Sequence, residues 1–159
     1  CTSLENITLP NQLTTLGAHA FYGCTSLQSI AIPGSLQKLK QYTFNGCTQL
    51  ATVTLNSGLK EIESHVFYGC SSLSSIVLPN TIEIIRTEAF RNTSISSVVI
   101  PESVYLVGKC SFANDNLISI TFNNLDGWYY GSSSESTKEE SETADSGIKK
   151  RKSELNYDF

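Results

Sequence analysis

The stretch CTSLQSIAIPGSLQKLKQYTFNG, at residues 24–46, decides the fold of this chain because the sequence on both sides repeats its pattern. Two columns of identical residues show a period of 23 residues, with a last step of 22. They are Cys1, Cys24, Cys47 and Cys70, and Phe21, Phe44, Phe67, Phe90 and Phe112. Self-similarity at a period of this size predicts a solenoid, in which each repeat forms one rung and stacks on the next.

Each rung is predicted to contain a strand, a turn and a return segment. The stretch Ile30-Ala31-Ile32 alternates along the chain and is rich in β-branched residues, as expected of a short strand with one buried face. Pro33 ends the strand, residues 36–39 return on the opposite side, and segments such as Ala20-Phe21 form a helical turn or corner. Because stacked strands lie about 4.8 Å apart, equivalent residues form columns, and we expect the phenylalanine column in the core.

The pattern C-x-x-L-x-x-I-x-L-P-x-x-L-x-x-I-x-x-x-A-F-x-G resembles the BspA-like leucine-rich repeat family over residues 1–122. The resemblance implies a right-handed, β-rich leucine-rich-repeat solenoid with short parallel strands and helical turns. It also implies a secreted or cell-surface protein, hence an extracellular location, with a role in adhesion or protein interaction. We divide the domain into five full repeats and a partial sixth, at 1–23, 24–46, 47–69, 70–92, 93–114 and 115–122.

The C-terminal part departs from the repeat. Residues 123–130 are expected to cap the last rung, since Trp128 and its neighbouring tyrosines can cover an apolar end while their polar atoms stay in water. Residues 131–159 hold 12 of the 26 charged side chains and little to bury, which predicts a polar, low-complexity tail. Either Ile148 or Leu155 to Phe159 can return to complete the cap. The rival interpretation makes the whole tail after Gly131 a disordered linker to a missing domain.

Composition excludes several functions. The net charge of -4 has the wrong sign for a nucleic-acid surface, and no apolar run is long enough for membrane insertion of this segment. No signal peptide is visible, and the chain opens at the first position of a repeat, so we expect a fragment of a longer protein.

Charged residues stand at two positions of the return segment. Lys40, Glu63 and Arg86 take a position where the family usually has glycine, and their alternating signs on adjacent rungs predict weak attraction. Glu61 and Glu63 flank Ile62 and are expected to face solvent together, as a feature of solubility and not as an acid–base pair.

No catalytic or metal site is predicted, and no cofactor. His19 and His65 share a repeat position but lie two rungs apart, about 10 Å, which is too far for two parallel side chains to hold one zinc ion. We interpret them as surface histidines on loops. The cysteine column is interpreted as buried, reduced thiols, because in-register Cβ atoms about 4.8 Å apart exceed the ~3.8 Å preferred in disulfides. The chain is therefore not predicted to be an enzyme.

The outward face of the strands is the predicted binding surface. Its candidate residues are Asn6, Thr8, Ser29, Thr52, Thr54, Ser75 and Ser97. They make a flat, uncharged strip without an aromatic residue, whereas protein-binding hot spots favour Trp, Tyr and Arg. Tyr22 and Tyr68, at the turns, are possible aromatic anchors; the competing interpretation makes them the solvent-facing rim of the phenylalanine column.

Two functional hypotheses remain open. The chain is a non-catalytic interaction module that binds a protein or cell-surface ligand, or it is a structural spacer within a longer multidomain surface protein. The sequence does not name the ligand.

Overall fold

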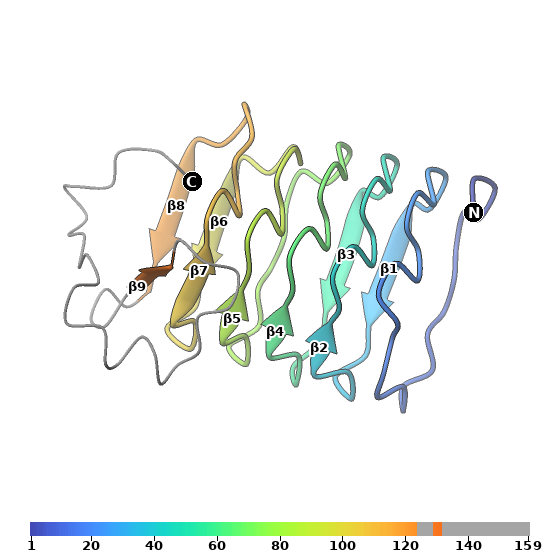
Figure 1. Ribbon diagram of the computed structural model, residues 1–159, viewed down its shortest axis with the longest axis horizontal. Coiled ribbons are helices and arrows are strands. Elements are labelled where there is room, and N and C mark those ends of the chain that lie inside the picture. The colour runs from blue at the N-terminus through green and yellow to red at the C-terminus, as the bar shows by residue number, and fades with distance from the viewer. Residues whose placement is uncertain (124–128, 132–159) are drawn as a thin grey trace.

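The computed structural model describes residues 1–123 and 129–131, and it forms a β-solenoid whose rungs follow one another along a single axis (Figure 1). Four-residue strands line one side of the solenoid and shorter return strands line the other. The former are β1 (Ser29–Ile32), β3 (Thr52–Leu55), β6 (Ser97–Ile100) and β8 (Ser119–Phe122). The latter are β2 (Lys38–Leu39), β4 (Glu61–Ile62), β5 (Ile84–Ile85), β7 (Leu106–Gly108) and β9 (Tyr129–Gly131).

The strands pair in parallel and in register, one repeat apart. In the pair β1–β3, Ser29 lies opposite Thr52, and the return strands form one sheet of order β2-β4-β5-β7-β9. In that sheet Tyr129 lies opposite Leu106, 23 residues earlier. The sixth repeat therefore has a return strand of its own, although its sequence pattern ends at Phe122. Residues 124–128 of the expected cap, and the tail from 132 onward, lie outside the described residues.

The fourth rung differs from the expected pattern. Residues 74–78 form no strand, so the long strands make two separate pairs, β1–β3 and β6–β8. No backbone hydrogen bond joins these five residues to a neighbouring rung in the described chain. Ile76 and Leu78 nevertheless remain buried, each 7% exposed. Apolar packing therefore holds residues 74–78 in place, whereas the return strand β5 of the same rung pairs with β4 and β7.

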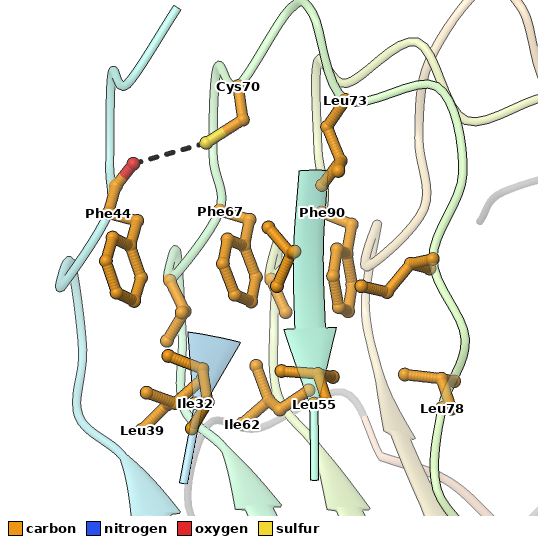
Figure 2. Packing of buried hydrophobic residues seen from close by; sticks show 14 of the residues in the cluster. Ile32, Leu39, Phe44, Leu55, Ile62, Phe67, Cys70, Leu73, Leu78 and Phe90 are labelled. Carbon is orange, nitrogen blue, oxygen red and sulfur yellow. Dashed lines mark hydrogen bonds between the residues drawn. The ribbon is translucent and has the colours of Figure 1, made fainter. Parts of the chain in front are cut away.

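The phenylalanine column forms the centre of the core, as the period predicts. Phe44, Phe67 and Phe90 are fully buried, and their rings stand nearly parallel along the axis (Figure 2). The centroid of Phe67 lies 5.4 Å from that of Phe44 and 5.2 Å from that of Phe90. Aliphatic side chains of both strand sets close around the rings, including Ile32 and Leu39.

The corner before the phenylalanines is a series of hydrogen-bonded turns, and the described residues contain no helix. Its main chain adopts a left-handed φ of 55° to 60° at one repeat position, although that position holds no glycine. The residues are His19, Tyr42, His65, Glu88 and Cys110. Hydrogen bonds between rungs secure this conformation, such as those from Phe21 N–H to Thr43 C=O at 2.9 Å and from Gly23 N–H to Asn45 C=O at 2.8 Å. The repeated backbone at this corner therefore sets several side chains in one line.

Candidate binding surfaces

The first candidate surface is the strand strip, formed by the outward-facing residues of the long strands and their equivalents in the other rungs. The structure places all seven predicted residues of this strip on the exposed surface: Asn6, Thr8, Ser29, Thr52, Thr54, Ser75 and Ser97. Ser29 Oγ donates to Asn6 Oδ1 at 3.5 Å, and the strip carries no charged side chain in the described chain.

Two valines interrupt the polar character of the strip. Val77 is 81% exposed and Val99, one rung further, is 53% exposed. Both occupy the repeat position that holds Thr8 and Thr54 in earlier rungs. The strip is thus polar towards β1 and β3 and more apolar towards β6, and it offers shallow contact without an aromatic anchor.

The second candidate surface is the aromatic corner, which we define as His19, Tyr22, Tyr42, His65 and Tyr68. Tyr42 lies between the two histidines, 4.9 Å from the ring centroid of His19 and 4.8 Å from that of His65, with interplanar angles of 17°. Tyr22 leans against His19, and Tyr68 leans against His65 in the same way, with both pairs of centroids 5.7 Å apart. Three consecutive rungs thereby present a continuous row of rings at the surface.

His19 is exposed and His65 half-buried, and both lie in turns, as expected of surface histidines on loops; Tyr42 joins them in one row of rings. His65 is partly covered, and its Nε2 lies 3.3 Å from a carboxylate oxygen of Glu88 on the next rung. Arg91 donates to the other oxygen of that carboxylate at 2.8 Å. The sequence contains the signal for this row, since Tyr42 is 23 residues from each histidine and the period places it between them.

Glu61 also departs from the sequence-based expectation. It is 8% exposed, and its carboxylate accepts hydrogen bonds from Lys38, at 2.8 Å, and from Arg86. Burial raises the pKa of Glu61, but the hydrogen bonds from Lys38 and Arg86 outweigh it and leave the pKa below its usual value. The ion pairs of Glu61 with Lys38 and Arg86 thus join β2, β4 and the residue after β5. They differ from the pairs among Lys40, Glu63 and Arg86 that the sequence predicts. Glu63 contacts Lys38 instead, at 3.6 Å, and accepts from the N–H of Gln41.

The cysteine column contains free thiols, in line with the interpretation as reduced cysteines. Cys24, Cys47 and Cys70 are buried, whereas Cys1 is exposed because no described rung covers it. The Sγ atom of Cys70 donates to the carbonyl of Phe44 at 3.2 Å (Figure 2), and Cys47 repeats this contact with Phe21. Burial raises the pKa of Cys47 to about 11 and raises that of Cys70 further. These thiols pack as small apolar groups and are poor nucleophiles at neutral pH.

The described part of the chain contains no cluster of three or more potential metal ligands among its His, Cys, Asp and Glu residues. It also contains no helix that is long and apolar enough to cross a membrane.

Comparison with known proteins identifies the repeat. The model of the BspA type leucine rich repeat region matches residues 1–124 in six copies. The chain belongs to the BspA-type leucine-rich repeat family. This leucine-rich repeat chain has no match among curated proteins.

Solved leucine-rich repeat proteins share its fold. A leucine-rich repeat protein from Bacteroides ovatus ATCC 8483 is 28% identical with a TM-score of 0.67, and the match covers 72% of this chain and 33% of that one. The Leucine Rich Repeat protein of T. pallidum is 36% identical with a TM-score of 0.69, over 72% of this chain and 56% of that one. A leucine rich cell surface protein from Faecalibacterium prausnitzii A2-165 is 25% identical with a TM-score of 0.57, over 76% of this chain and 39% of that one. The chain therefore spans 33% to 56% of these three proteins.

Proposed function

We propose that this chain is a non-catalytic interaction module of a secreted or cell-surface protein, and that it acts in adhesion by binding a protein ligand. The aromatic corner is the observation that supports this proposal most strongly. Tyr22 is 55% exposed, and tyrosine is among the residues that dominate the binding energy of protein interfaces. The ring stack also holds these side chains in place before binding, which lowers the entropy that a ligand must overcome.

The strand strip contributes a second contact area in this proposal. Its in-register columns are flat and uncharged, so a partner lying along them desolvates few charged groups. Shallow contacts of this kind add shape complementarity around the anchors and contribute little energy individually. The location outside the cell is proposed from the family and from the neighbour in F. prausnitzii, which is described as a cell surface protein.

Selection from a phage-displayed peptide library tests the proposal against the spacer hypothesis. We expect enriched peptides to bind the chain, and their binding to be lost in a variant that carries arginine at Thr52, Thr54 and Ser75 or in a variant with leucine at Tyr22 and Tyr68. The arginines obstruct the strip and the leucines remove the anchors. Folding of each variant is checked by circular dichroism and by a thermal melt.

A matched control carries three arginines at exposed positions outside both surfaces, Gln37, Gln49 and Asn80. This control should bind the selected peptides as the wild type does. Peptides that bind all variants equally, or a selection that enriches nothing, would support the spacer and overturn the interaction module.

A further inference from the structure

The aromatic corner is an array of two columns and three rungs with an aromatic ring at five of its six positions. The first column is His19, Tyr42 and His65, and the second is Tyr22, Asn45 and Tyr68. Asn45 is the exception, because its short amide stands where the pattern places a third ring. The two tyrosines of the second column therefore have no ring between them.

The spacing of these tyrosines follows from the stack beneath them. Tyr22 leans on His19 at an interplanar angle of 45°, and Tyr68 leans on His65 at 41°, so the two phenol rings repeat almost unchanged after two rungs. Two rungs correspond to about 9.6 Å between equivalent atoms. A planar group held midway between the rings would lie about 4.8 Å from each of them.

Asn45 supplies a polar group on the rung between these two tyrosines. Its N–H donates to the carbonyl of Tyr42 at 3.2 Å, and its own carbonyl accepts from Gly23 at 2.8 Å, so its backbone is already satisfied. Its side-chain amide has no hydrogen-bond partner among the described residues. An amide oxygen is therefore available between the two phenol rings.

We infer that Tyr22, Asn45 and Tyr68 form a binding site for a guanidinium group, namely an exposed arginine side chain of the protein that this module binds. The inference rests on the proposed interaction function and assigns it a recognition element. A cation is attracted to an aromatic face when it lies within about 6 Å of the ring centroid, and the position between the tyrosines satisfies this limit for both rings. The flat guanidinium stacks on aromatic faces and donates to the Asn45 oxygen from its edge.

The surrounding charges permit this occupant. Arg91 follows Tyr68 in the same column, one rung further, but its charge is balanced by Glu88, whose carboxylate it contacts at 2.8 Å. The chain thereby already places one compensated guanidinium beyond Tyr68, and the inferred site lies on the other side of that ring. Tyr22, Asn45 and Tyr68 themselves carry no positive charge.

Titration with a small probe tests the inference. Acetyl-Gly-Arg-Gly-amide is added to the ¹⁵N-labelled chain while the side-chain amide of Asn45 and the ring protons of Tyr22 and Tyr68 are followed by NMR. A single side chain should bind with a Kd on the order of millimolar. The matching peptide with citrulline, the uncharged isostere of arginine, should shift these resonances at least about 3-fold less strongly, because it lacks the cation–π attraction.

Two variants and one control locate the site. Tyr22→Leu should weaken binding of the arginine peptide about 2- to 5-fold by removing one ring. Asn45→Tyr should abolish binding while the chain stays folded, since it places a third ring where the guanidinium would lie. Tyr105→Leu, which changes a tyrosine on the return side of the solenoid, should leave binding unchanged.

Three results would overturn the inference. They are equal binding of the citrulline peptide, undiminished binding to Asn45→Tyr, and a stronger response of the same resonances to methyl glucoside, which would assign the site to saccharides. If the arginine peptide fails while library-selected peptides still bind the wild type, the guanidinium site is wrong and the interaction module stands.

Discussion

Replacement of Phe67 by alanine tests whether the ring column carries the stability of the solenoid. Phe67 is fully buried and stacks between Phe44 and Phe90, with centroids 5.4 Å and 5.2 Å away. Its removal leaves a cavity that rungs on both sides cannot close without moving their own rings. We therefore expect Phe67→Ala to lower the free energy of unfolding by about 3–5 kcal/mol.

The loss of stability should depend on the position of the phenylalanine along the column. Phe21 is 9% exposed and has one ring neighbour in the described column, Phe44. Since each aromatic pair contributes about 0.5–1.5 kcal/mol beyond burial, Phe21→Ala should cost about 1 kcal/mol less than Phe67→Ala. Ser75→Ala, on the exposed strand strip, should stay within about 0.5 kcal/mol of the wild type.

Urea unfolding followed by circular dichroism measures all three variants under one set of conditions. The urea midpoint should be lowest for Phe67→Ala, higher for Phe21→Ala and highest for Ser75→Ala, while the dependence of the free energy on urea stays similar. Coinciding midpoints for Phe67→Ala and Ser75→Ala would refute the assignment of the inner and outer faces.

Three further predictions concern charge, thiols and the C-terminal end. Because the pKa of Glu61 lies below its ordinary value of 4.5 in the folded chain, its stabilising contribution is present above that pH and is lost as the pH falls through the lowered pKa. Glu61→Gln should therefore lower the free energy of unfolding in urea at neutral pH by about 1.5–3 kcal/mol, and should weaken the loss of stability at acidic pH. Glu83→Gln, in an exposed pair, should change the free energy of unfolding by less than about 1 kcal/mol. Iodoacetamide at pH 8 should label Cys1 at least about 100-fold faster than Cys47 in the folded chain, and equal rates, read by mass spectrometry, would contradict the burial of Cys47. A chain that ends after Asn124 lacks β9 and should melt at a lower temperature than the full chain, while an unchanged melting temperature would show that the sixth return strand adds no stability.

The repeat period was sufficient to predict the rungs, the columns and the free thiols. In a stack, the partner of each residue is the residue one period away, so a one-dimensional pattern specifies the main contacts. Phe67 could be assigned to the core from the recurrence of phenylalanine at one repeat position, and Thr52 to the outer face from the alternation within the strand. The same reasoning predicted the exposed positions of the strand strip, although their role in binding remains a proposal.

The interruption of the long strands at residues 74–78 could not be read from the pattern. The fourth repeat has the same apolar positions as its neighbours, and those positions specify burial but not the hydrogen bonds between main chains. The same limit applies to β9, since Tyr129 and Tyr130 continue the register of Leu106 and Val107 without continuing the repeat motif.

By itself, the sequence determined which residues share a column, because that depends only on the period. The tertiary structure alone decided how neighbouring columns meet across a corner. It brought Arg86 to Glu61, although the two stand two positions apart in the repeat, and it set Tyr22 against His19 and Tyr68 against His65. These contacts depend on left-handed turns and on side-chain directions within a rung, and neither can be read from the pattern of residues in the repeat.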